Sequence, residues 1–127
     1  MKTTFETDEG GVTVSLSEWK VLEFFWANGG SCFARDVFAE ISKTSDISIK
    51  TVRTFLSRLI TKGFLKYRKH GKSYRYFAVV TREDILKEEL RRILRKRFQN
   101  DYAAFFRCII NEDILTAKEF KEILSCI

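Results

Sequence analysis

The apolar residues of this chain change their spacing at Gly63. Upstream of it they recur every three or four residues, which is the spacing of a buried helix face. Downstream, residues 64–69 and 73–79 are two short runs rich in aromatic and β-favouring side chains. The two runs flank a short basic tip at 70–72, so they predict a β-hairpin. We therefore expect helices before Gly63 and a hairpin directly after it.

Serine and glycine mark the ends of three helices in this first part. A serine hydroxyl accepts a backbone N–H of the first helical turn, and glycine ends a helix by adopting a left-handed conformation. A minor strand over 12–16 is expected ahead of the first helix. The predicted fold class is mainly α with a small β-hairpin, in the element order of a winged helix-turn-helix. The predicted helices are 17–28, 31–43 and 48–62, capped by Ser17, Ser31 and Ser48.

The third predicted helix has one apolar face and one polar, basic face. Residues 49–62 include no Asp or Glu. The residues that fall on the apolar side are Val52, Phe55, Leu56, Leu59 and Ile60. A helix fits the major groove of B-form DNA, where Lys, Arg, Ser and Thr contact base edges or phosphates. This helix is therefore a candidate recognition helix. Base contacts are expected from Lys50, Thr51, Thr54 and Ser57, and phosphate contacts from Arg53 and Arg58.

Positive charge is concentrated in the third helix and the hairpin. The chain has a formal net charge of +6, and residues 43–80 contain ten Lys and Arg residues against one Asp. A block of this kind attracts a polyanion. The hairpin tyrosines Tyr67, Tyr74 and Tyr76 either pack on the helices or donate to phosphates. Wing contacts to the DNA backbone or the minor groove are expected from Lys69, His70, Lys72 and Arg75.

Helical spacing returns after residue 80. A capping-box pattern at 81–84 opens a helix that Asn100-Asp101 ends. Two shorter helices are expected over 102–111 and after Thr116. We expect a winged helix-turn-helix DNA-binding domain over 1–80 and a helical dimerisation region over 81–127.

The last 47 residues have more apolar surface than a segment of this length can bury alone. Symmetric association with a second copy of the chain is the simplest way to cover it, so a homodimer is expected. Dimer contacts are expected from Leu90, Ile93, Leu94, Phe98, Phe105, Phe106, Ile109, Phe120, Ile123 and Leu124.

The cysteines favour a reducing compartment. Cys32, Cys108 and Cys126 are odd in number and widely spaced, which disfavours a disulfide framework. The sequence has no CxxC or CxC pair and a single His, so no metal site and no cofactor are predicted.

Without an activated nucleophile or a base beside it, no catalytic residue and no enzymatic activity are predicted. No apolar run is long enough to insert into a membrane, and the expected location is the cytoplasm.

Several stretches resemble the BlaI/MecI/CopY family of penicillinase-repressor regulators. They are SEWKVL at 17–22 with Trp26, KTVRTFLSRL at 50–59 followed by Lys62-Gly63, and Asn111-Glu112. The stretch at 50–59 is the most specific of them. The resemblance implies a winged-helix domain, a helical dimerisation region and repression of transcription at palindromic DNA operators. It also implies derepression by proteolysis, with a membrane-bound sensor metalloprotease as a partner.

This chain departs from the family in the signals that release its members from DNA. Penicillinase repressors are cleaved at an Asn-Phe bond in the dimerisation region, whereas the corresponding place here is Arg107-Cys108. Copper-responsive members have a paired CxC motif near the C-terminus, whereas only Cys126 lies there. One alternative function stays open: a winged-helix module for protein interaction, or for nucleic-acid binding without sequence preference.

Overall fold

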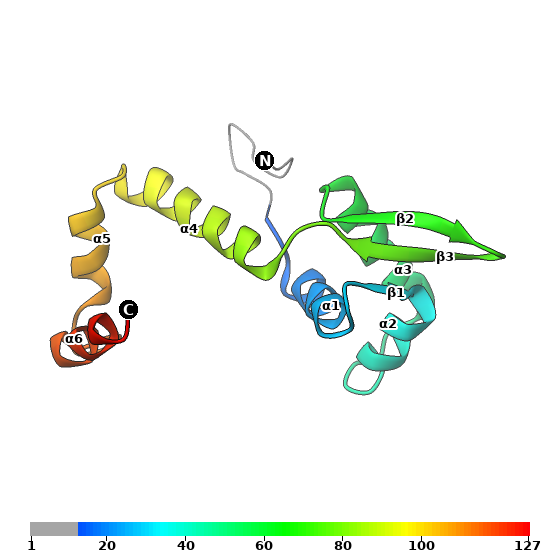
Figure 1. Ribbon diagram of the computed structural model, residues 1–127, viewed down its shortest axis with the longest axis horizontal. Coiled ribbons are helices and arrows are strands. Elements are labelled where there is room, and N and C mark those ends of the chain that lie inside the picture. Colours follow the sequence, from blue (N-terminus) through cyan, green and yellow to red (C-terminus); the bar gives the residue numbers. More distant parts are fainter. Residues whose placement is uncertain (1–12) are drawn as a thin grey trace. The chain divides into compact units, whose positions relative to one another are not determined.

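The computed structural model describes residues 13–127, which are mainly helical with one small sheet (Figure 1). This confirms the predicted fold class. The strand expected over 12–16 is wrong for residues 13–16, because Leu16 already begins the first helix; Val12 lies outside the described residues. The elements are α1 (Leu16–Ala27), β1 (Ser31–Phe33), α2 (Ala34–Ile41), α3 (Ile49–Thr61), β2 (Leu65–His70), β3 (Ser73–Ala78), α4 (Arg82–Phe98), α5 (Tyr102–Ile109) and α6 (Ala117–Ser125).

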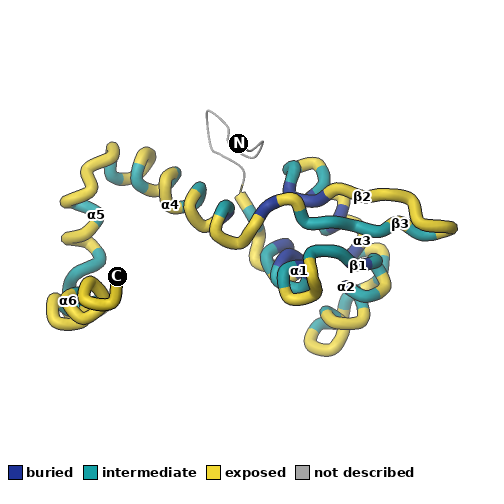
Figure 2. The backbone as a smooth tube through the Cα atoms, viewed as in Figure 1, coloured by how far each residue is buried: buried dark blue, intermediate teal, exposed yellow. Residues whose placement is uncertain are grey.

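One apolar core is enclosed by α1, α2, α3 and the sheet (Figure 2). It confirms the predicted inward face of the third helix: Val52, Leu56 and Leu59 are fully buried. Phe55 and Ile60, predicted on the same face, are partly buried against the core. Burial of one such side chain contributes about 1.5–3 kcal/mol, so this face fixes how α3 is rotated. The buried apolar residues are Val21, Leu22, Phe25, Cys32, Val37, Val52, Leu56, Leu59, Phe64, Leu65, Val80 and Ile85.

The first helix begins two residues earlier than predicted, because Ser15 and not Ser17 is its N-cap. The Ser15 hydroxyl accepts the backbone N–H of Glu18 at 3.1 Å, and the Glu18 carboxylate accepts the backbone N–H of Ser15 at 3.0 Å. This capping box needs Glu or Gln three residues after the serine, and only Ser15 has one. Glu18 is buried, and its Oε1 lies 2.6 Å from Nζ of Lys62 at the end of α3.

The Glu18 carboxylate is ionised in the folded protein. Burial alone would raise its pKa, but hydrogen bonds from Lys62 and from the Ser15 backbone outweigh burial and lower the pKa below its ordinary value. Lys62 Nζ also donates to the carbonyl of Thr13 at 2.7 Å. The ion pair therefore joins the start of α1 to the end of α3.

The second predicted helix, in contrast, starts later than expected, because residues 31–33 form the edge strand β1. This strand pairs antiparallel with β3, with Ser31 opposite Phe77 and Phe33 opposite Arg75. The helix begins after Phe33, whose backbone N–H donates to Asp36 Oδ2 at 3.0 Å. Ser31 is thus a strand residue and not the predicted N-cap.

The predicted hairpin is confirmed as β2 and β3, which pair antiparallel from Leu65 opposite Ala78 to His70 opposite Ser73. Gly71 in the turn has a φ of 64°, a left-handed conformation that favours glycine. The sheet order is β1-β3-β2, so the hairpin is part of a three-stranded sheet. Trp26 Nε1 donates to the carbonyl of Val80 at 3.0 Å, which ties the end of the hairpin to α1.

The chain divides into two compact units between Glu88 and Glu89, within α4. The predicted capping box at the start of α4 is present: the Thr81 and Asp84 side chains each accept the other's backbone N–H at 3.0 Å. Ile85 in the first turn of α4 is buried in the core of the first unit.

The second unit, from Glu89 to Ile127, has no buried residue. It contains a row of ring contacts in which Phe98 meets Phe105, Phe105 meets Phe106, and Phe106 meets Phe120, with centroids 5.4–6.0 Å apart. In Figure 2 the helices α5 and α6 are drawn only as intermediate or exposed. The apolar residues of this unit therefore meet one another without forming an interior.

We expect Glu18→Gln to lower the free energy of unfolding at pH 7 by about 1–3 kcal/mol, because Lys62 loses its buried anionic partner. The folded-state pKa of Glu18 lies below its unfolded value of about 4.3. The stabilisation by the Glu18–Lys62 pair is therefore fully present above the unfolded pKa and is lost as the pH falls through the folded-state pKa. Urea unfolding at pH 7 and at about pH 3 measures both free energies.

The control for this prediction is Glu23→Gln. Glu23 Oε2 lies 3.1 Å from Arg82 Nη1, but both side chains of this pair are nearly half exposed. Its removal should change the free energy of unfolding by less than about 0.5 kcal/mol. Equal losses from the two variants, or a Glu18→Gln loss that does not shrink in acid, would contradict the prediction.

Candidate nucleic-acid interface

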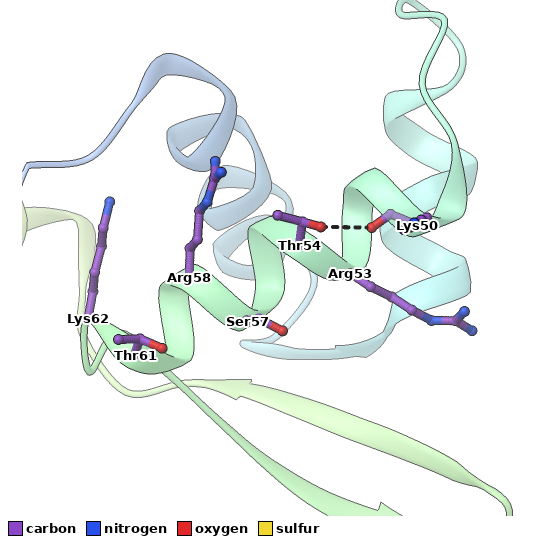
Figure 3. Close-up of a pocket in the computed structure, with 7 residues that line it drawn as sticks. All are labelled: Lys50, Arg53, Thr54, Ser57, Arg58, Thr61 and Lys62. Atoms are coloured by element: carbon purple, nitrogen blue, oxygen red, sulfur yellow. Dashed lines mark hydrogen bonds between the residues drawn. The ribbon is translucent and has the colours of Figure 1, made fainter.

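The outward face of α3 forms an open hollow of about 450 Å³ (Figure 3). Because the opposite face of the helix is buried, the polar residues between the apolar ones have to face solvent. The helix is capped by Ser48, as predicted, whose hydroxyl accepts the backbone N–H of Thr51 at 3.2 Å. The residues that line the hollow are Lys50, Arg53, Thr54, Ser57, Arg58, Thr61 and Lys62.

The hollow brings together five of the six residues predicted for the recognition helix. The sixth, Thr51, is half-buried at the N-cap, where its hydroxyl lies 3.1 Å from that of Ser48. Thr54 Oγ1 donates to the carbonyl of Lys50 at 3.1 Å, shown as the dashed line in Figure 3. The Thr54 oxygen retains its lone pairs as acceptors, and its methyl group stays available for an apolar contact.

Lys62 lines the hollow but was not among the predicted site residues. Its ammonium is held by the Glu18 carboxylate and the Thr13 carbonyl. No local pattern links Lys62 to Glu18, which lies 44 residues earlier, so only a search for a partner to a buried Glu could have found it. The positive charge of Lys62 is thus neutralised within the fold, and Lys50, Arg53 and Arg58 are the other cations of the hollow.

The four predicted wing residues lie in two different places. Lys69, His70 and Lys72 are exposed at or beside the turn of the hairpin. Arg75 instead lies within β3, half-buried, and its guanidinium donates to Ser31 Oγ at 2.9 and 3.2 Å. The fold therefore gives Arg75 a hydrogen-bond partner on β1. His70 is exposed but lies with its ring centroid 5.7 Å from that of Phe33, also on β1.

The three hairpin tyrosines gather on one face of the sheet. Tyr67 lies edge-on to Tyr74 with ring centroids 5.4 Å apart, and its centroid is 6.3 Å from that of Tyr76. Tyr67 and Tyr74 are exposed, whereas Tyr76 is half-buried. Burial raises the pKa of Tyr76 against the opposing effect of nearby Arg53, so this face of the wing lies close to α3.

The charge of the α3 hollow differs from that of two other hollows on the same unit. None of the described residues that line the α3 hollow is Asp or Glu. The two hollows beside α1 and α2 mix acidic and basic residues: one has Asp36 and Glu40 with Lys43 and Arg75, and the other has Glu23 and Glu40 with Lys20. An anionic ligand is therefore favoured at α3 over these two hollows.

The described residues show no arrangement suited to metal binding, since no three His, Cys, Asp or Glu side chains are grouped there. Cys32 is buried, which raises the pKa of its thiol to about 12 and keeps it protonated. Cys108 and Cys126 are exposed and form no disulfide. No helix within residues 13–127 is long and apolar enough to cross a bilayer.

The sequence pattern described as penicillinase repressor matches residues 14–127 of this chain. The chain belongs to the penicillinase repressor family. The match spans both compact units, and it confirms the resemblance predicted from the sequence. It also makes the winged helix and its C-terminal helices parts of one family architecture.

Individual members of the penicillinase repressor family match this chain over most of its length. The penicillinase repressor of Staphylococcus aureus is 29% identical over 112 residues, which is 88% of either chain. The methicillin resistance regulatory protein MecI of S. aureus strain N315 is 26% identical over 110 residues, covering 87% of this chain and 89% of that protein. The solved monomeric form of Bacillus licheniformis BlaI, in complex with the blaP half-operator, is 35% identical with a TM-score of 0.49, covering 57% of this chain and 87% of that one.

In this penicillinase repressor family member, we expect Lys62→Ala to lower the free energy of unfolding by about 1–3 kcal/mol, because Glu18 stays buried without its cation. The matched control is Lys50→Ala, which removes an exposed lysine of the same helix and should change that free energy by less than about 0.5 kcal/mol. Urea unfolding of both variants measures the difference. Equal effects would show that Lys62 has no role in the fold beyond that of a surface lysine.

Proposed function

We propose that this chain represses transcription by binding a palindromic DNA operator as a homodimer. The observation that carries the proposal is the outward face of α3, which presents Lys50, Arg53 and Arg58 with the hydroxyls of Thr54 and Ser57. These groups match what a recognition helix needs in a major groove: donors for guanine and phosphate, hydroxyls for either, and a methyl group for thymine. Membership of the penicillinase repressor family supports the same function.

The proposed division of labour on the DNA follows from chemistry. Lys50, Thr54 and Ser57 are proposed to contact base edges, and Thr51 to contribute only at the end of the helix. Arg53 and Arg58 are proposed to hold phosphates and so set the register of the helix. In the wing, Lys69, His70 and Lys72 are proposed to meet the backbone or the minor groove, with Arg75 acting from within the sheet.

The proposed dimer interface is the apolar surface of the second unit. Leu90, Ile93, Phe106, Ile123 and Leu124 each have 42–51% of their surface exposed. Exposed apolar side chains at this density mark a surface that a partner covers. Leu94, Phe98, Phe105, Ile109 and Phe120 are half-buried beside them and are proposed to complete the interface.

A second copy of the chain is the proposed partner because a two-fold dimer covers the same surface on both subunits. A two-fold dimer presents two α3 helices, so it fits an inverted repeat with half-sites in successive major grooves. The predicted boundary at 80/81 assigns all of α4 to the dimerisation region, and we retain it as a proposal.

Release from DNA is proposed to follow proteolysis by a membrane-bound sensor metalloprotease. Support comes from the family alone. Arg107 and Cys108, at the place where the family resemblance puts the scissile bond, are exposed in the last turn of α5. An Arg-Cys bond differs from Asn-Phe in charge and size, so we propose that the protease of this system has a different specificity or cuts at another bond.

We expect the chain to bind its own promoter DNA at least tenfold more tightly than scrambled DNA, because base contacts add to the phosphate contacts that both DNAs offer. Arg53→Ala and Arg58→Ala should weaken binding to both DNAs, whereas Thr54→Ala should reduce the preference for the promoter. Gel-shift titrations at fixed salt measure these ratios. Equal affinity for promoter and scrambled DNA would favour binding without sequence preference instead.

We expect Leu90→Glu to convert the dimer to a monomer, because it places a charge in an interface that is otherwise apolar. Sedimentation at about ten micromolar gives the mass, and operator binding should weaken by at least tenfold while half-site binding is unchanged. Lys96→Glu, an exposed polar position of the same helix, is the control that should stay dimeric. A wild-type chain that sediments as a monomer would rule out the dimer.

A further inference from the structure

A second hollow, of about 530 Å³, lies where the start of α2, the middle of α3 and the turn of the hairpin approach one another. Three elements each supply one cation to it: Arg35 from α2, Arg53 from α3 and Lys72 from the turn. None of the described residues that line it is acidic. The lining residues are Phe33, Ala34, Arg35, Arg53, Ser57, Lys72, Ser73, Tyr74 and Tyr76.

This hollow, named here the α2–wing hollow, adjoins the hollow on α3. Arg53 and Ser57 line both. Figure 3 shows Arg53 and Arg58 pointing to different sides of α3, and of these two only Arg53 lines the α2–wing hollow. The hydroxyls of Ser57, Ser73, Tyr74 and Tyr76 add neutral donors to the three cations. An anionic backbone that lies along the outward face of α3 would therefore also reach the α2–wing hollow.

Arg35 is held at this hollow at a position that is unfavourable for its helix. It is the second residue of α2, where the helix dipole favours negative and not positive charge. Its guanidinium carbon lies 4.4 Å from the centre of the Phe33 ring, a cation–π contact that restrains the exposed side chain. The arrangement costs the helix some stability, and it keeps a planar set of N–H donors at the mouth of the hollow.

We propose that the α2–wing hollow seats one phosphodiester of the DNA backbone, and that Arg35 is a phosphate-binding residue of this chain. The assignment rests on the proposed DNA binding and adds α2 to the elements that touch DNA. A phosphodiester has two unesterified oxygens that match the paired donors of a guanidinium. Arg53 and Lys72 complete the charge, and the serine and tyrosine hydroxyls can donate to the same oxygens.

The first test compares Arg35→Ala with the wild type by fluorescence anisotropy, on promoter and on scrambled DNA, over a series of salt concentrations. Loss of one charge-assisted contact should weaken binding to both DNAs about fivefold to twentyfold. The slope of log affinity against log salt should fall by about 1, since one fewer counterion is released. Arg35→Lys keeps the positive charge but lacks the paired donors of the guanidinium, so its affinity should lie between those of the wild type and Arg35→Ala.

The matched control is Lys20→Ala, which removes one positive charge from the exposed surface of α1. It should change affinity by less than about twofold and leave the salt slope unaltered. Arg35 is exposed, and its cation–π contact and its position in the first turn of α2 act in opposite directions, so the melting temperature of each Arg35 variant should stay within about 3 °C of that of the wild type. Should Arg35→Ala unfold, the comparison of Arg35→Lys with the wild type gives the same test.

The second test locates the phosphate. Each promoter duplex of a series has one phosphate replaced by a neutral methylphosphonate, at a different position in each duplex. The wild type should bind less tightly to the duplex whose neutral group replaces the phosphate seated in the hollow. Arg35→Ala should lose less affinity for that duplex, because this variant already lacks the contact between Arg35 and the phosphate. A methylphosphonate profile unchanged by Arg35→Ala would overturn the proposal, as would an Arg35→Ala affinity equal to that of Lys20→Ala. If the wild type binds neither DNA, the repressor function itself is wrong.

Discussion

Val52, Leu56 and Leu59 are fully buried against the other elements of the first unit, and this packing fixes the rotation of α3 about its own axis. The residues on the outward face are determined by this packing, since burial of one side of a helix leaves the opposite side exposed. The Glu18–Lys62 ion pair restrains the end of α3 further by joining it to the start of α1. The cations and hydroxyls of α3 are therefore displayed by a rigid support, as a site for a stiff partner such as duplex DNA requires.

The parts of this fold that were predictable are those with long and regular patterns. The 13 residues of α3 contain several turns of helical spacing, so the element, its cap at Ser48 and its buried face followed from the sequence. The hairpin was predictable because two β-favouring runs flank a glycine turn. The same regularity predicted five of the residues that line the α3 hollow.

The parts that were missed depend on partners distant in the sequence. The strand β1 has three residues, too few for a pattern, and it forms because β3, which lies 42–46 positions later in the chain, pairs with it. Lys62 and Arg75 were classed by type as cations, but their partners Glu18 and Ser31 are each 44 residues distant. Ser15 and Ser17 suit an N-cap equally well by residue type, and only Glu18, three residues after Ser15, separates them.

The Glu18–Lys62 pair also limits how this protein could be retargeted. A library that randomises the outward positions of α3 to obtain a new operator preference can vary Lys50, Thr54 and Ser57, since these side chains contribute little to the core. Position 62 lines the same hollow but is coupled to position 18, so a change at one demands a compensating change at the other. Among relatives that diverge in operator, residues 18 and 62 should accordingly change together, while their neighbours on the helix drift independently.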